Sequence, residues 1–233
     1  VGEREVDDRV PQIVVDDTTE ALGALAAEVV QRALGFGNLT IVGITGSNGK
    51  TSTKNLTRAM AERVGPTVAS VKSFNNEVGG PLTMLRVERD TATLVAEMGA
   101  SAEGEIARLT AMAPPHIGVV LSVGLAHAGE FGGIDSTHRA KTEMVQDLPR
   151  SAVAILNRDD PRVAQMADVT AARVRWFGFT PGSDVRASDV HTSLTGTRFT
   201  LHLEGEALPV RFPVLGEHQV MNALAAAAVG SEL

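Results

Sequence analysis

Short apolar runs alternate with amphipathic stretches along most of the chain. The apolar runs are four to seven residues long and predict buried strands at 39–44, 67–70, 94–98, 117–123 and 153–157. Helices are expected between them, one beginning near Gly49 and another over 81–86. Such alternation predicts an α/β fold with a largely parallel sheet that helices flank on both faces.

Both ends of the chain depart from this alternation. Residues 11–15 predict a strand, and Asp17 is expected to cap a helix that the glycine-rich segment 35–38 breaks. One strand and one helix cannot bury a core, so we interpret residues 1–38 as the tail of a domain that begins earlier. Residues 39–233 are then the main domain. It is expected to close with a smaller antiparallel group over 185–190, 198–203 and 208–214, followed by an alanine-rich helix over 222–229.

Composition narrows the class of protein. The 233 residues carry a net charge of −7 without a basic cluster, which argues against a nucleic-acid partner. Cysteine is absent, which excludes disulfides and thiolate metal sites. No apolar run approaches the ~18 residues of a membrane span. The first residues lack the pattern of a signal peptide, and the missing initiator Met leads us to expect truncation or processing at that end.

The most informative segment follows the first buried run. A glycine-rich turn leads into Gly-Lys-Thr at the start of a helix, where backbone N–H groups and the helix N-terminus can hold phosphate oxygens. Lys50 would reach the β- and γ-phosphates of ATP, and the Thr51 hydroxyl would bind Mg²⁺. The spacing departs from the usual phosphate loop because Gly43 lies one residue early, so an ordinary turn with a solvated lysine is the alternative. The predicted ATP-binding residues here are Thr45, Gly46, Ser47, Asn48, Gly49, Lys50, Thr51 and Ser52.

The segment Thr-Gly-Ser-Asn-Gly-Lys-Thr resembles the loop of the Mur ligase superfamily, which joins an amino acid or peptide to a carboxylate through an acyl phosphate. A second segment, Ser-Phe-Asn-Asn-Glu-Val-Gly-Gly-Pro at 73–81, resembles the MurF type within it, the UDP-N-acetylmuramoyl-tripeptide–D-alanyl-D-alanine ligases. The resemblance implies that Ser73, Asn75 and Asn76 face the UDP-muramoyl substrate. From the residues alone, a local Asx turn is the alternative.

Three further segments carry metal ligands in this family. Glu97 ends a buried run, and a carboxylate at the end of a parallel strand lies where such sheets place ligands. The resemblance implies that Glu97 binds magnesium, as Thr51 is expected to do, and that His127 binds a second magnesium. It also implies that Lys141 carries a carbamate whose oxygens bind magnesium. A free ammonium ~4 Å from a divalent cation would cost roughly 8 kcal/mol at an effective dielectric constant of 20, and CO₂ addition reverses its charge. The alternatives are a surface glutamate, a structural histidine and a lysine on a helix surface.

The last matching segments concern the nucleotide and a strand end. Asn222 is implied to contact the adenine, with His218 beside it, because residues four apart share one face of a helix. Structural roles remain open for both. Asp159 and Asp160 match a family strand end, but we favour capping of a helix that begins near Pro161. The remaining histidines outside these motifs are expected to be structural.

As a whole, the resemblance implies a Mur-ligase-like central ATP-binding domain over 39–233, preceded by the tail of a UDP-binding domain and lacking the C-terminal domain. It implies an ATP- and Mg²⁺-dependent ligase of peptidoglycan precursor synthesis, inactive as this isolated piece. The expected partners are UDP-MurNAc-tripeptide and D-Ala-D-Ala, and we expect a cytoplasmic monomer. The alternatives are another amide ligase of the superfamily, such as a folylpolyglutamate synthase, or a nucleotide-binding module without catalysis.

Overall fold

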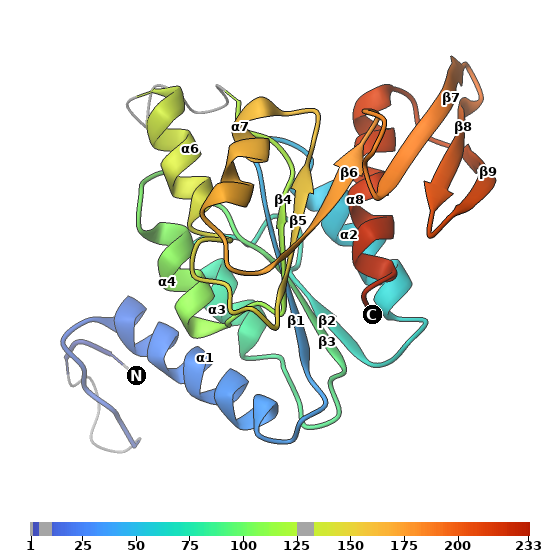
Figure 1. Cartoon of the computed structure of the whole chain (residues 1–233). Coiled ribbons are helices and arrows are strands. Elements are labelled where there is room, and N and C mark those ends of the chain that lie inside the picture. Colours follow the sequence, from blue (N-terminus) through green and yellow to red (C-terminus); the bar gives the residue numbers. More distant parts are fainter. Residues whose placement is uncertain (1, 5–10, 125–132) are drawn as a thin grey trace.

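The computed structural model of the protein describes residues 2–4, 11–124 and 133–233. Within them a single sheet runs in the order β2-β3-β1-β4-β5-β6-β7-β8-β9 (Figure 1). The strands are β1 Thr40–Thr45, β2 Thr67–Ala69, β3 Thr93–Glu97, β4 Ile117–Val120, β5 Val153–Asn157, β6 Arg173–Gly178, β7 Val185–Ser193, β8 Gly196–Leu203 and β9 Glu206–Phe212.

The predicted sheet type is confirmed. In the order of the sheet, neighbouring strands from β2 to β7, including β1, pair in parallel. Strands β7, β8 and β9 pair antiparallel, so the antiparallel group extends the same sheet. The expected strand over 117–123 is shorter than predicted and ends at Val120. Strand β6 was not predicted, because its sequence alternates arginine with apolar residues and lacks a continuous apolar run.

Two layers of helices cover the sheet, as predicted (Figure 1). Helices α1, α3, α4, α6 and α7 lie on one face, and α2 and α8 lie on the other. Alternate strand residues serve the two cores: Leu94 and Ala96 belong to the first and Val95 to the second. The helices are α1 Thr18–Leu34, α2 Lys50–Ala61, α3 Gly79–Met84, α4 Glu105–Met112, α6 Ile134–Thr142, α7 Pro161–Gln165 and α8 Glu217–Gly230.

The N-terminal segment differs from the prediction in one respect. Asp17 caps α1 as expected, its side chain accepting from the N–H groups of Thr19 and Glu20. The strand expected over 11–15 is wrong, because only an isolated bridge joins Val14 to Gly2 and the Val14 side chain is half exposed. Ala26 and Val30 of α1 are fully buried in the core that also holds α3 and α4. The assignment of residues 1–38 to a further domain stays a prediction.

Two helices begin earlier than predicted. Helix α3 begins at Gly79 rather than at residue 81, and α8 begins at Glu217 rather than at 222. The first turn of α8 is polar and precedes the alanine-rich stretch, but the expected pairing of His218 with Asn222 on one helix face agrees with the earlier start. None of the described helices has the length and apolar character needed to cross a membrane.

The order of the strands fixes where a ligand can bind. Strand β1 lies between β3 and β4. The strands that follow β1 in the chain, β2 and β3, lie toward one edge of the sheet, and β4 and the later strands lie toward the other edge. Open α/β sheets bind ligands at the carboxyl ends of strands at such a switch point. The carboxyl ends of β1, β3 and β4 therefore mark the candidate site.

Candidate functional site

A glycine-rich turn connects β1 to α2 at this switch point. Gly46 has a φ of 152° and Gly49 a φ of 86°, conformations that residues with a side chain rarely adopt. Lys50 opens α2, and its Nζ donates to the Gly46 carbonyl oxygen at 2.7 Å, so the ammonium lies across the turn. The turn, the helix N-terminus and the cation together form a cradle suited to phosphate oxygens.

The segment after β4 holds this turn in place. Ser47 donates through Oγ to the Gly124 carbonyl oxygen at 3.1 Å and accepts from the Gly124 N–H at 2.8 Å. The N–H groups of Ser47 and Asn48 donate to the carbonyl oxygen and the Oγ of Ser122. The Ser47 side chain, predicted to bind ATP, is therefore also a support for the loop.

The end of β5 fixes the same segment from the other side. Asn157 donates through Nδ2 to the Leu121 carbonyl oxygen at 2.8 Å, and Asp160 accepts from the Val123 N–H at 2.8 Å. Asp160 also caps α7, which confirms the favoured interpretation for this residue. For Asp159 that interpretation is wrong. Its carboxylate accepts from the N–H groups at 179 and 180 and holds the turn after β6.

A buried carboxylate joins the phosphate-loop helix to the 73–76 segment. Glu97 ends β3 and is 1% exposed. The hydroxyl of Thr51 donates to its two carboxylate oxygens at 3.0 and 3.2 Å, and Asn75 donates through Nδ2 at 2.8 Å. A carboxylate and a hydroxyl beside a phosphate cradle are the donor set that Mg²⁺ prefers. Among the described residues, no cluster of three or more His, Asp or Glu adds further ligands.

Cations gather around this carboxylate. The chain has four lysines, and burial lowers the pKa of three of them, Lys50, Lys54 and Lys141. The charge of Glu97 opposes the lowering at Lys50 and Lys54. The pKa of Lys141 falls to about 8, through burial first and the nearby Lys50 charge second, against the charge of Glu143. Three of four lysines in one buried region of an acidic chain indicate an anionic ligand.

The helix that carries Lys141 is anchored beside the site. Glu143 accepts from the N–H groups of Gly104 and Ala107 at 2.6 and 2.9 Å, so it binds the first turn of α4. Lys141 lies two residues before it and is 3% exposed, which rules out the alternative of a surface lysine. His127, the other predicted magnesium ligand, lies outside the described residues.

The three predicted substrate-binding residues differ in their exposure and in their hydrogen-bond partners. Ser73 is exposed, and Asn75 is held by Glu97 and by the Gly99 N–H, which donates to the Asn75 carbonyl oxygen at 2.8 Å. Asn76 makes the local turn that the sequence left open, its Oδ1 accepting from the Gly79 N–H at 2.9 Å. A role of these residues in substrate binding stays a prediction.

A pocket of about 400 Å³ opens directly from the phosphate loop. Asn222 and His218 of α8 line it, as expected from their spacing. Phe179 also lines it, and sequence reasoning missed this residue because it follows the unpredicted strand β6. A pocket with one aromatic ring and convergent polar groups, continuous with a phosphate cradle, fits a purine nucleotide. The full lining is Asn48, Gly49, Leu121, Ser122, Asn157, Phe179, Glu217, His218, Met221 and Asn222.

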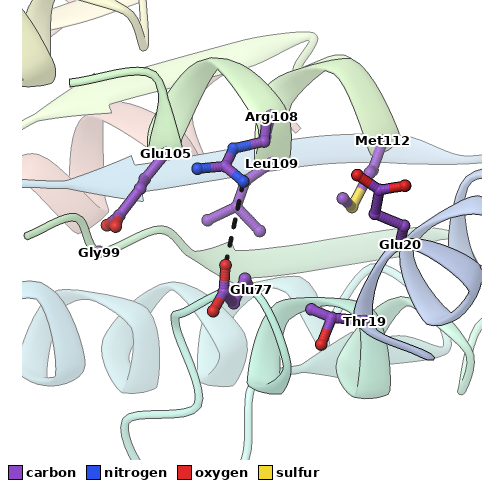
Figure 2. A pocket seen from close by; sticks show the side chains of 8 residues that line it. All are labelled: Thr19, Glu20, Glu77, Gly99, Glu105, Arg108, Leu109 and Met112. Atoms are coloured by element: carbon purple, nitrogen blue, oxygen red, sulfur yellow. Dashed lines mark ion pairs between the residues drawn. The ribbon is translucent and has the colours of Figure 1, made fainter. Parts of the chain in front are cut away.

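A second, smaller pocket lies on the other side of Glu97. It measures about 90 Å³, and its apolar floor comes from Leu109 and Met112 of α4. Figure 2 shows Arg108 and Glu77 facing each other across it, with 4.0 Å between the guanidinium and the carboxylate. Gly99, two residues beyond Glu97, lines this pocket, so it adjoins the Glu97 cluster away from α8.

We expect Gly49→Ala to weaken Mg·ATP binding at least about tenfold. A Cβ at Gly49 would overlap Oδ1 of Asn222, and left-handed backbone costs a non-glycine residue roughly 1–2 kcal/mol. Titration calorimetry measures the dissociation constant. Gly205→Ala is the matched control, because Gly205 has a φ of 83° and nothing near its Cβ position. Equal effects of the two variants would contradict the overlap with Asn222.

The lowered pKa of Lys141 predicts a pH dependence of stability. The unfolded chain binds more protons than the folded chain between pH 8 and 10.5, so the free energy of unfolding should rise over that window, by up to about 3 kcal/mol. Urea denaturation in CO₂-depleted buffer measures the rise, which should be smaller in Lys141→Met, where the lowered pKa values of Lys50 and Lys54 still contribute. Lys72→Met, at an exposed position, should keep it. A difference between wild type and Lys141→Met that stays constant with pH would argue against burial of the ammonium.

Three of the histidines expected to be structural, His116, His138 and His202, form hydrogen bonds within the fold. Nδ1 of His116 accepts from the Ile41 N–H at 3.0 Å at the start of β1, and burial lowers the pKa of His116. His138 and His202 contact the Arg162 carbonyl oxygen and the Ser188 hydroxyl through Nε2. These contacts agree with the expectation that they serve the fold.

Comparison with known proteins identifies relatives over almost the whole chain. Residues 44–230 match the Mur ligase middle domain. The UDP-N-acetylmuramoyl-tripeptide–D-alanyl-D-alanine ligase of Mycobacterium leprae is 50% identical over 91% of this chain and 44% of its own length. The structure of MurF from Acinetobacter baumannii has a TM-score of 0.91 and 33% identity, over 100% of this chain and 51% of that one.

A third relative was solved with a nucleotide. MurF ligase from Thermotoga maritima in complex with ADP has a TM-score of 0.88 and 27% identity, over 99% of this chain and 53% of that one. The chain thus spans about half the length of the relatives it matches.

Proposed function

The chain belongs to the Mur ligase family through its middle domain, and on that premise we propose that it is the ATP-binding part of a MurF-type ligase. The proposed reaction adds D-Ala-D-Ala to UDP-MurNAc-tripeptide with conversion of ATP to ADP and phosphate. The observation that carries the proposal is the Glu97 cluster, in which one carboxylate bonds both Thr51 of the phosphate-loop helix and Asn75 of the segment typical of this type. The 50% identity to a curated ligase of that name supports it.

The two pockets suggest how the substrates lie. Adenine would occupy the pocket beside Asn222 and Phe179, with the triphosphate along the loop toward Lys50. The acceptor carboxylate must then approach the γ-phosphate from the other side, where Asn75 and the pocket of Arg108 lie. This order places the cations around Glu97 where the negative charges of both substrates meet.

The residues would act on a phosphoryl transfer. The peptide carboxylate attacks the γ-phosphorus, the bond to the β-phosphate oxygen breaks, and ADP leaves. Lys50 and the loop N–H groups stabilise charge on the transferred group. The dipeptide amine then attacks the acyl phosphate, phosphate leaves, and the amine loses a proton. Glu97 and Thr51 fit a Mg²⁺ ion by their oxygen donors, with Lys141 as a carbamate and His127 as further proposed ligands. When bound, the ion neutralises phosphate charge.

The test is ADP release by the complete ligase that contains this sequence, with products identified by mass spectrometry. UDP-MurNAc-pentapeptide should form only when UDP-MurNAc-tripeptide, D-Ala-D-Ala and Mg·ATP are all present. Product with a different amino-acid donor or acceptor would assign another amide ligase of the family. Binding of Mg·ATP without turnover under any of these conditions would leave a nucleotide-binding module and overturn the proposal.

We further propose that the 233-residue piece is inactive alone, and that the ligase is a cytoplasmic monomer. The first statement rests on the chain spanning only about half the length of the relatives it matches. Pentapeptide formed by the isolated piece would contradict the first statement. Light scattering coupled to size exclusion tests the oligomeric state, and fractionation of the producing cells tests the location.

A further inference from the structure

One buried lysine outside every motif connects the two halves of the site. Lys54 lies one helical turn after Lys50 on α2 and is 2% exposed. Its Nζ donates to the carbonyl oxygens of Ser70 and Lys72 at 2.8 and 2.6 Å. Burying an ammonium is costly unless it is hydrogen-bonded, so these two carbonyls fix its place and it fixes theirs.

The turn that Lys54 holds contains a strained backbone conformation. Lys72 has a φ of 51°, in the left-handed region that residues with a side chain seldom adopt. This turn leads directly into the segment 73–76. The other end of that segment is held by Glu97 and Gly99 through Asn75.

The segment 73–76 is thus supported from two sides. Ser70 strengthens the first support, because its Oγ accepts from the Glu97 N–H at 3.1 Å while its carbonyl oxygen accepts from Lys54. The ammonium therefore links the phosphate-loop helix to the turn at the start of the segment. The ammonium has three N–H donors, so it can donate to both carbonyl oxygens at once.

We propose that Lys54 is a positioning residue that sets the acceptor site. It holds the 73–76 segment in place from the helix that binds the nucleotide, so acceptor affinity depends on α2. The identity of the acceptor in this inference rests on the proposed function. The structural part, that Lys54 holds the turn at 70–72, does not depend on it. Lys54 touches neither nucleotide nor acceptor in this arrangement; it acts through the turn at 70–72.

The test compares Lys54→Met with Thr57→Val in the complete ligase. Thr57 is buried on the same helix, and its Oγ1 has no hydrogen-bond partner among the described residues, so Thr57→Val changes α2 without touching the turn. Lys54→Met should raise the KM for UDP-MurNAc-tripeptide at least tenfold and change the dissociation constant of Mg·ATP less than threefold. Hydrogen exchange should accelerate in peptides that cover 70–80. Thr57→Val should do neither.

Loss of nucleotide and acceptor binding by equal factors would mean general destabilisation and overturn the proposal. Unchanged exchange over 70–80 in Lys54→Met would also overturn it. If the wild-type ligase forms no pentapeptide, the proposed function fails, and the exchange comparison still decides whether Lys54 holds the segment.

A chemical rescue keeps the test decisive if Lys54→Met folds poorly. The chain has no cysteine, so Lys54→Cys introduces the single thiol of this domain. Alkylation with 2-bromoethylamine in denaturant, followed by refolding, restores an ammonium at the length of lysine. In a ligase otherwise free of cysteine, this product should recover the KM of the wild type, whereas alkylation with iodoacetamide should not. Equal recovery with both reagents would contradict the role of the ammonium.

Discussion

Lys50→Met in the complete ligase is expected to lower ADP formation by about 10²–10³-fold, with the fold intact. The ammonium lies across the phosphate loop, bonded to the Gly46 carbonyl oxygen, and a γ-phosphate in this cradle would be its natural counter-charge. Preorganised donors at developing charge are typically worth about that factor each. A coupled assay for ADP measures the rate, and circular dichroism checks the fold.

The control for this variant is Lys72→Met. Lys72 is exposed, and the contact it makes to Lys54 uses its backbone carbonyl, which methionine retains. We expect near wild-type rates for it. A rate for Lys50→Met within a factor of three of the wild type would remove Lys50 from the reaction and return the loop to the alternative of an ordinary turn.

Most of the sheet could be predicted because its central strands are buried on both faces. Strand β5 coincides with the predicted run, since both cores draw on continuous apolar residues there. Strand β6 lacks such a run. Its arginines come before the residues of β6 that pair with β7, and Arg175 there pairs with Glu232 near the C-terminus, a partner 57 residues away. A contact so distant leaves no local pattern in the sequence.

The candidate site shows the same difference between local sequence patterns and distant contacts. Residues proposed to meet a ligand directly, such as Lys50 and Glu97, occur in short motifs and were predicted. Residues that hold those motifs in place were not, because their partners come from other strands: Asn157 bonds the segment after β4, and Lys54 bonds the turn after β2. The resemblance could point to Asn75 but not to its hydrogen bond with Glu97, which needs the register of β3 beside β2.

Lys141 should carry one added CO₂ in the active ligase, and Lys141→Met should lower ADP formation by about 10–100-fold. Burial and the charge of Lys50 lower the pKa of Lys141 to about 8, so a useful fraction of the amine is neutral near that pH. The neutral amine attacks CO₂, an N–C bond forms, one C=O π bond becomes an anionic oxygen, and the nitrogen loses a proton to solvent. The product is an anion with two oxygens in place of a cation beside Lys50.

Carbon-13 NMR with labelled CO₂ provides the direct measurement. A carbamate signal should be present in the wild type and in Lys72→Met, absent in Lys141→Met, and stronger as the pH rises from 7 to 8.5 at constant dissolved CO₂. Activity in CO₂-depleted buffer should fall and return on addition of bicarbonate. Full activity of Lys141→Met, or a signal that survives this substitution, would contradict the carbamate. Lys141 would then act as a second ammonium beside Lys50, and bicarbonate would leave the rate unchanged.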